Sequence, residues 1–213
     1  MMFFKQLKVG QMHNFSYIIG DEQAKEAAVV DAGWEADKLI RIAYEENLKI
    51  TKLILTHSHY DHTQKADELA SKTNAEVYFH EDEYNEIKRS IKNPSIKLIK
   101  IKNNQIIKIG EISIEVIHTP GHTPGGVCLL VENKLLTGDT LFVSAIGRTD
   151  LPGGDVIKLF ESLQKLKKLD EDIEVYPGHD YGEIPSSTIG DEKKNNPYFK
   201  CETKEQFLNY LKN

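Results

Sequence analysis

Apolar residues recur along the chain in two patterns, which predict strands and helices in alternation. Short apolar runs bounded by turn residues are typical of buried strands, whereas apolar positions three or four residues apart are typical of helices. The first half therefore predicts strands and helices in turn. Strands are expected at 15–19, 27–31, 50–56 and 76–79, and helices at 35–47, 63–72 and 81–91.

The second half is richer in strand patterns. Strands are expected at 105–109, 112–118, 126–131, 134–137 and 173–176. Apolar and polar residues alternate in 112–116, as in a strand with one buried face. Leu159, Leu163 and Leu166 recur at helical spacing, and Thr203 with Gln206 forms a capping-box pattern before a final helix. This order favours two packed sheets with helices outside them, although periodicity alone defines only a mixed α and β class.

Composition and charge narrow the class of protein. Apolar residues make up 39% and charged residues 28% of the 213 residues, which is typical of a globular chain, and we expect a single domain over 1–213. The net charge of −6 argues against a nucleic-acid partner. No apolar stretch approaches the roughly 20 residues that span a membrane, and the start is too polar for a signal peptide. The cysteines, Cys128 and Cys201, suggest no disulfide framework, so we expect a cytoplasmic protein. The oligomeric state is not indicated.

Residues capable of binding metals cluster at the ends of predicted strands. Five of the eight histidines and one aspartate follow strand-like runs directly. They are His57, His59, His62, His122, His179 and Asp139. Loops at the ends of a rigid sheet hold reactive groups in fixed geometry, so this placement indicates one shared site.

The spacing within residues 57–62 has a direct chemical meaning. His57 and His59 are two positions apart, so in an extended segment both imidazoles leave the same side and can bind one cation. Asp61 and His62 lie where a helix is expected to begin, which turns them toward a neighbouring second cation. Four residues that can bind metals within six positions are difficult to attribute to chance. By contrast, we interpret His13 and His80 as surface histidines and His118 as structural.

The same residues carry a family resemblance. His57-x-His59-x-Asp61-His62, followed by His122, Asp139 and His179 in Gly-containing turns, is similar to the metallo-β-lactamase-fold hydrolases. Residues 30–33, 135–142, 146–155 and 188–198 resemble the short glyoxalase II-type hydroxyacylglutathione hydrolases within that superfamily. The resemblance runs from about residue 12 to residue 198.

The resemblance implies a fold and a ligand set. The fold would be a four-layer αβ/βα sandwich, an α/β architecture of two mixed sheets with helices on the outer faces. One metal would take His57, His59 and His122, and the other Asp61, His62 and His179, with Asp139 bridging. We expect two divalent cations, with zinc favoured by nitrogen and oxygen ligands and iron or manganese as alternatives.

The implied activity is metal-dependent hydrolysis of a thioester such as a hydroxyacylglutathione, a small anionic molecule. A hydroxide shared by the cations would attack the carbonyl carbon, with Asp61 and Asp139 as the catalytic carboxylates that hold the metals. Only 15 residues follow Tyr198, so the separate C-terminal helical region that helps glyoxalase II bind glutathione is not expected. This departure leaves the thiol carrier open.

The sequence leaves alternative functions open and offers two candidate residues for contact with the substrate. A persulfide (sulfur) dioxygenase would hold one iron through His57, His122 and Asp139, and hydrolysis of lactones or other esters is a further possibility. A non-catalytic metal-binding protein is disfavoured, because degenerate members usually lose ligands. Arg148 is predicted either to meet an anionic end of the substrate or to pair with a nearby aspartate. Tyr181 is predicted to donate a hydrogen bond to the substrate.

Overall fold

Two six-stranded sheets, each mixed in strand direction, form the centre of the protein. They are seen in a computed structural model that describes residues 1–212. The first sheet has the strand order β1-β2-β3-β4-β5-β6. Its strands are β1 (Met2–Val9), β2 (Asn14–Asp21), β3 (Glu26–Val30), β4 (Lys49–Ile54), β5 (Glu76–His80) and β6 (Leu98–Ile101). Strands β1 to β3 are antiparallel, and β3 to β6 are parallel.

The second sheet has the strand order β14-β13-β10-β9-β8-β7. Its strands are β7 (Ile106–Ile109), β8 (Ile112–His118), β9 (Val127–Val131), β10 (Lys134–Gly138), β13 (Glu174–Pro177) and β14 (Ser187–Thr188). Only β10 and β13 pair in parallel. The short strands β11 (Leu141–Phe142) and β12 (Ala145–Ile146) pair with each other beside this sheet.

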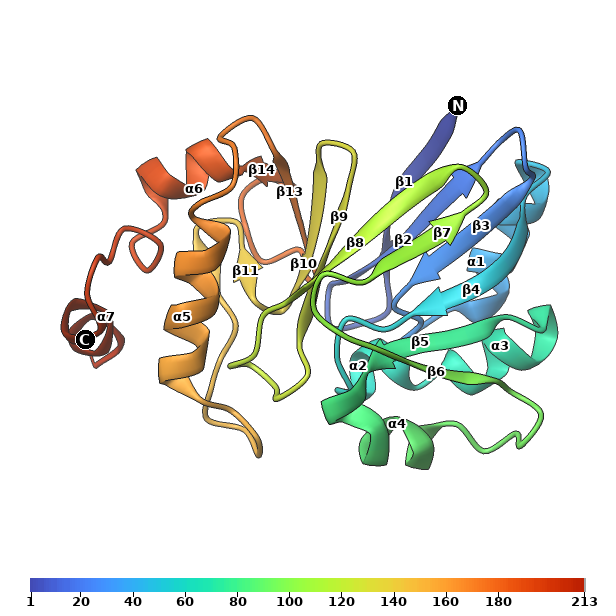
Figure 1. Cartoon of the computed structure of the whole chain (residues 1–213), viewed down its shortest axis with the longest axis horizontal. Coiled ribbons are helices and arrows are strands. Elements are labelled where there is room, and N and C mark those ends of the chain that lie inside the picture. The colour runs from blue at the N-terminus through green and yellow to red at the C-terminus, as the bar shows by residue number, and fades with distance from the viewer. Residues whose placement is uncertain (213) are drawn as a thin grey trace.

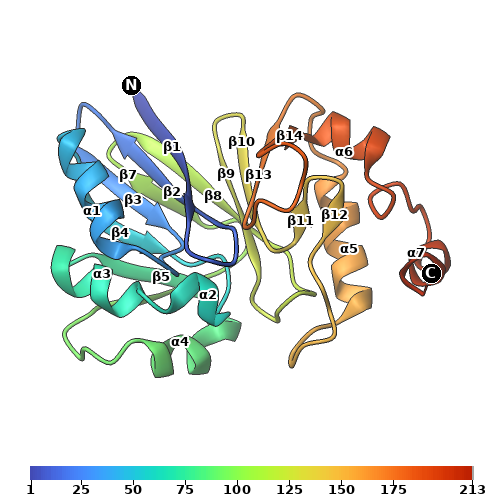
Figure 2. The same cartoon turned by 180° about the vertical axis from the view of Figure 1, so that it is seen from behind.

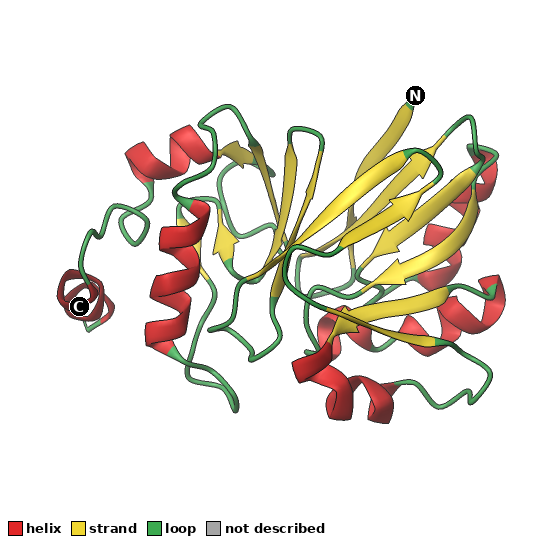
Figure 3. Ribbon diagram, viewed as in Figure 1, coloured by secondary structure: helices red, strands yellow, loops and turns green. Residues whose placement is uncertain are grey.

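Helices cover the outer face of each sheet (Figure 1). On the first sheet lie α1 (Ala36–Glu45), α3 (Ala66–Thr73) and α4 (Tyr84–Ser90), with the one-turn helix α2 (Tyr60–Thr63) and the 3-10 turn η1 (Glu81–Glu83) beside them. On the second lie α5 (Val156–Leu166) and α6 (Ile189–Asn195), and α7 (Lys204–Leu211) packs against α5 on the side away from the sheet, as the view from behind also shows (Figure 2). The result is helix, sheet, sheet and helix, visible when helices and strands are coloured apart (Figure 3). The predicted four-layer sandwich is confirmed.

Three apolar cores hold these layers together. Leu39, Leu53 and Leu69 belong to the core between the first sheet and its helices. Ile19 and Val116 belong to the core between the two sheets. The third core, which includes Leu159, Leu163 and Phe207, joins the second sheet to α5 and α7. Every residue of β2 is buried, because the strand lies inside the first sheet and both of its faces are covered.

The predicted elements are found with small changes of boundary, and several others were not predicted. Strands β1 and β6 are the edges of the first sheet and are only partly buried, so their apolar pattern is weak. Helix α6 and strands β11, β12 and β14 are too short to show a period. The capping box of α7 is present, with Thr203 accepting a hydrogen bond from the Gln206 N–H. Cys128 is buried in β9.

Within residues 1–212, no helix combines the length and apolar character needed to cross a membrane. The cytoplasmic location and the single-domain organisation over 1–213 stay predictions.

Candidate metal centre

Strand ends from both sheets bring seven metal-binding side chains to one edge of the sandwich. The segment after β4 carries His57 and His59 and leads into α2, which carries Asp61 and His62. The turns after β8, β10 and β13 carry the three other side chains. These are His122, Asp139 and His179. All seven side chains are buried except that of His59, which is half-buried.

Three histidines form the first ligand group. The ligand nitrogens of His57, His59 and His122 all lie within 4.8 Å of one another. His59 Nδ1 and His122 Nε2 are 2.8 Å apart, and the ring centroid of His57 lies 4.8 and 5.0 Å from those of His59 and His122. Imidazole nitrogens this close together can occupy neighbouring ligand positions around one cation.

Asp61, His62 and His179 form the second ligand group, with ligand atoms within the same 4.8 Å limit. His62 Nε2 lies 3.1 Å from His179 Nε2, and His179 Nε2 lies 3.2 Å from Asp61 Oδ2. Asp139 stands between the two groups. Its Oδ2 is 3.5 Å from His122 Nε2 and 3.3 Å from His179 Nε2, so a single carboxylate faces both groups.

Protein acceptors fix the orientation of four imidazoles through Nδ1. His62 Nδ1 donates to Asp31 Oδ2 at 2.8 Å, His122 Nδ1 to the Arg148 carbonyl at 2.7 Å, and His179 Nδ1 to the Met12 carbonyl at 2.9 Å. His57 Nδ1 lies 3.1 Å from the hydroxyl oxygen of Thr56, whose own proton is donated to Asp31. With the proton held on Nδ1, the lone pair of Nε2 faces the centre, which is the arrangement that metal-binding histidines require.

Two buried atoms at the centre lack a hydrogen-bond partner. Among the described residues, His57 Nε2 and Asp139 Oδ1 are buried with no partner in hydrogen-bonding geometry, although His62 Nε2 lies 3.3 Å from Asp139 Oδ1. An unpaired buried polar atom is costly, and both atoms are ligand types. The donor set and these two atoms therefore fit a pair of divalent cations.

Asp31 and Asn14 support the ligands, and the sequence pattern did not reveal these roles. Asp31 accepts hydrogen bonds from both the N–H and the hydroxyl of Thr56 as well as from His62. Asn14 Nδ2 donates to Asp61 Oδ2 at 2.8 Å, while Asn14 Oδ1 accepts from the Trp34 indole at 2.8 Å. Asp31 lies in the motif of residues 30–33, which carries part of the family resemblance. The motif marks Asp31 as important but does not indicate what it does. Asn14 has no comparable signal, because it is one polar residue at the start of an apolar strand.

The approach of the backbone explains the glycines near the ligands. A Cβ on Gly178 would lie 2.3 Å from Asp139 Oδ1, and one on Gly33 would lie 1.5 Å from the Asp61 carbonyl oxygen. Any side chain at these positions would displace the segment that carries a ligand. The glycine before His179 therefore lets the backbone approach Asp139 closely.

The carboxylates and imidazoles of the centre shift one another's pKa values. Burial raises the pKa of Asp61 and of Asp139, but neighbouring histidines outweigh burial, so both pKa values lie below the ordinary range. Burial lowers the pKa of His62 and of His179, but the carboxylates outweigh it and raise these pKa values to about 8 and about 10. For His57, burial and the neighbouring His62 lower the pKa, which keeps the ring neutral.

Arg148 and Tyr181 lie at the margin of the centre. The guanidinium of Arg148 donates two hydrogen bonds of 2.6 Å to the carboxylate of Asp150, and both side chains are exposed. The ring of Tyr181 stacks on His179 with centroids 4.5 Å apart and an interplanar angle of 10°. Substrate binding by either residue stays a prediction.

A third group, His80, Asp82 and His118, also has closely spaced ligand atoms. His80 is buried, so its interpretation as a surface histidine was wrong. Its ring stacks in parallel on that of His118, with centroids 3.8 Å apart and an interplanar angle of 12°. Nitrogen lone pairs lie in the ring planes, so parallel stacked rings do not converge on one cation. His118 Nε2 instead donates to the Pro124 carbonyl at 2.9 Å, and we assign no metal here.

Residues 9–179 match the protein family described as the Metallo-beta-lactamase superfamily. The chain belongs to this superfamily. Its ligand groups and its relatives make it a metal-dependent hydrolase of that superfamily.

Known relatives align with most of the chain. It is 36% identical over 198 residues to the probable polyketide biosynthesis zinc-dependent hydrolase BaeB of Bacillus velezensis, covering 92% of this chain and 86% of the relative. It is 34% identical over 205 residues to the hydroxyacylglutathione hydrolase GloC of Haemophilus influenzae, covering 89% and 94%. The crystal structure of ETHE1 from Myxococcus xanthus superposes with a TM-score of 0.87 at 30% identity, covering 100% of this chain and 91% of that one.

Proposed function

We propose that this hydrolase cleaves a thioester, with hydroxyacyl thioesters of the glutathione type as the first class to test. The observation that carries the proposal is the pair of ligand groups with Asp139 between them. We assign His57, His59 and His122 to one divalent cation. We assign Asp61, His62 and His179 to the other, with Asp139 as a shared ligand. Zinc suits this nitrogen and oxygen set, and iron and manganese are the alternatives.

Two cations at these groups would acidify a water molecule to give a nucleophile and would polarise the substrate carbonyl. The protein residues supply orientation. Asp61 has one oxygen fixed by Asn14, so its carboxylate cannot rotate freely. Asp61 and Asp139 are both ionised at neutral pH, because their pKa values lie below the ordinary range, and can hold cations without first losing a proton.

The leaving group needs little help from the protein. A thiol has a pKa of about 8.5, so a thiolate departs with little protonation, unlike an amine or an alkoxide. This favours a thioester as the substrate. The seven ligand-type side chains of the centre include no serine or cysteine that could act as the nucleophile. The Tyr181 hydroxyl, whose pKa is raised by burial and by Asp139, stays protonated and would donate a hydrogen bond to the substrate. The interaction of Arg148 with an anionic acyl end is part of the same proposal.

The decisive experiment combines metal analysis of the purified protein with assays on S-lactoylglutathione and on glutathione persulfide. We expect two metals per chain and hydrolysis of the thioester. One iron per chain with oxygen consumption would contradict hydrolysis. Two metals without turnover of any thioester would direct the search to lactones and other esters.

A pair of histidine variants tests the ligand assignment. His57→Ala should lose metal and activity together, because it removes a buried ligand of the first group. The matched control is His13→Asn, at a histidine outside both groups whose φ of 59° asparagine tolerates. Retention of both metals by His57→Ala would show that the assignment is wrong.

The second candidate is the dioxygenase with one iron. It is favoured by the proximity of His57, His122 and Asp139, since Asp139 Oδ2 is 3.5 Å from His122 Nε2. The complete second group argues for hydrolysis instead, because one iron would leave Asp61, His62 and His179 without a cation to bind.

A further inference from the structure

A groove of about 500 Å³ opens beside the metal centre. Its lining includes His59, a member of the first ligand group, and the neighbours of His59, Ser58 and Tyr60. Pro124, Leu151 and Pro152 also line it. These side chains give the groove mostly apolar walls.

Carboxylates supply the charge of this groove. Asp82, Glu83 and Glu86 line it, all from η1 and α4. Glu83 is buried and accepts hydrogen bonds from the Ser58 hydroxyl and from the Gly125 N–H, at 2.9 Å for the latter. Both donors are uncharged, so they orient the carboxylate without neutralising it.

The two other carboxylates are only partly compensated. Asp82 lies 3.6 Å from His80 Nδ1, but burial and the stacked His118 lower the pKa of His80, which leaves that ring neutral. Glu86 is 3.3 Å from Arg89, an exposed cation that does not line the groove and offsets part of the Glu86 charge.

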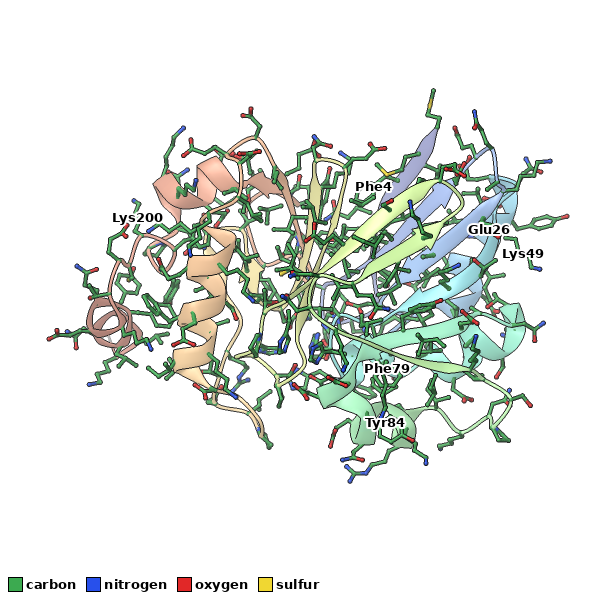
Figure 4. The ribbon with its side chains drawn as sticks, in the orientation of Figure 1. Phe4, Glu26, Lys49, Phe79, Tyr84 and Lys200 are labelled. Carbon is green, nitrogen blue, oxygen red and sulfur yellow. The ribbon has the colours of Figure 1, made fainter. Side chains whose placement is uncertain are left out.

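Within residues 1–212, no lysine or arginine lines the groove. Apart from Arg89, which pairs with Glu86, three cations have partners outside the groove. Arg148 is held by Asp150 through two hydrogen bonds. Lys88 and Lys100 lie over the ring of Tyr84, with Nζ 5.5 and 3.9 Å from its centroid. Tyr84 itself stacks on Phe79 of β5 and anchors α4 there (both are labelled in Figure 4).

We propose that this groove binds the thiol-side arm of the substrate and selects an arm that is uncharged or cationic over an anionic one. The proposal rests on the proposed thioester hydrolysis and narrows its substrate, because it disfavours glutathione itself, whose two carboxylates and one ammonium group give the thiol arm a net negative charge. A groove of this volume exceeds the needs of a two- or three-carbon acyl group, so it suits the longer arm. The apolar walls fit a methylene chain, and the carboxylates fit amide N–H donors. An anionic arm would meet like charges.

The test compares lactoyl thioesters that share one acyl group and differ in the charge of the thiol. The thiols are thiocholine, which is cationic, N-acetylcysteamine, which is neutral, and 3-mercaptopropionate, which is anionic. We expect kcat/KM for the anionic ester to be about tenfold below that of the neutral ester at low salt, and the difference to shrink as salt screens the charges.

A double variant, Asp82→Asn with Glu86→Gln, removes two charges from exposed positions. It should raise kcat/KM for the anionic ester several-fold and leave that for the neutral ester within about twofold. The control is Glu45→Gln with Glu46→Gln at the C-terminal end of α1, which changes the net charge equally away from the groove. Glu45 forms the same kind of exposed pair, with Arg41 at 3.8 Å. Circular dichroism and metal content establish that both variants fold and bind metal.

The outcomes separate the two proposals. Thioester turnover with equal or better kcat/KM for the anionic ester overturns the groove assignment and leaves the hydrolase proposal standing. A preference that the double variant does not change, or that the α1 control changes equally, also overturns the assignment. Absence of turnover for all three esters and for S-lactoylglutathione, with both metals bound, overturns the proposed function and this inference with it, whereas turnover of S-lactoylglutathione alone overturns only the groove assignment.

Discussion

Asp31→Asn tests whether the orientation of His62 controls the second metal site. Asp31 accepts from Thr56 N at 2.8 Å, from Thr56 Oγ1 at 2.7 Å and from His62 Nδ1 at 2.8 Å. Asparagine keeps the shape and tolerates the φ of 57° at this position. If its NH₂ group replaces Oδ2, it faces the His62 Nδ1–H, and if the amide is flipped, it faces the Thr56 N–H. A donor therefore opposes a donor in either orientation.

The structure gives the size of the effect. Loss of one hydrogen bond to a buried charged acceptor costs about 1.5–3 kcal/mol. At about 2–4 °C per kcal/mol for a chain of this size, Tm should fall by roughly 3–12 °C. The metal should be affected as well, since His62 would relieve the opposition by moving its proton to Nε2, the atom that faces the centre. We expect the affinity of the second site to fall by about 10–100-fold.

The assay is a metal titration against a competing chelator, with thermal unfolding of the metal-free protein measured in parallel. Asp21→Asn is the matched control. Asp21 is also buried and accepts from the N–H groups of Gln23 at 2.9 Å and Glu111 at 2.8 Å, but it is not a neighbour of any ligand in either group. It should lose comparable stability and retain both affinities. Wild-type affinity at both sites in Asp31→Asn would refute the reasoning.

Three further outcomes follow from the same centre. Zinc binding at pH 7 should release about two protons, because His62 and His179 have pKa values raised to about 8 and about 10 in the metal-free state and must be neutral to bind. Calorimetry in buffers of different ionisation enthalpy measures the number of protons released. A binding enthalpy that is the same in every buffer would contradict the prediction. Asn14→Leu, which removes the hydrogen-bond donor to Asp61, should weaken the second site by about tenfold, seen as a fall toward one metal per chain in elemental analysis at limiting zinc. Removal of metal with a chelator should lower the stability by about 4 kcal/mol per site when free metal had been at 1,000 times its Kd, and unfolding in urea with and without zinc tests that value.

The sequence predicted the strands that deliver the ligands, because those strands are buried. β4, β8, β10 and β13 lie inside their sheets, so apolar residues recur along at least one buried face of each strand. The edge strands β1 and β6 have no such constraint and left no clear pattern. The histidine run was recognisable for a different reason, because several ligands lie within a few positions of one another in the chain.

The sequence by itself determined which side chains are available to bind metals and that they follow strands. Only the tertiary structure decided what surrounds them. Asn14 is 47 positions from Asp61, and the Met12 carbonyl is 167 positions from His179, yet each pair forms a hydrogen bond. The acidic groove likewise joins segments around residues 58–60, 82–86, 123–124 and 151–153. Hydrogen bonds and electric fields depend on distance in space, and folding brings together groups whose separation along the chain gives no sign of their contact.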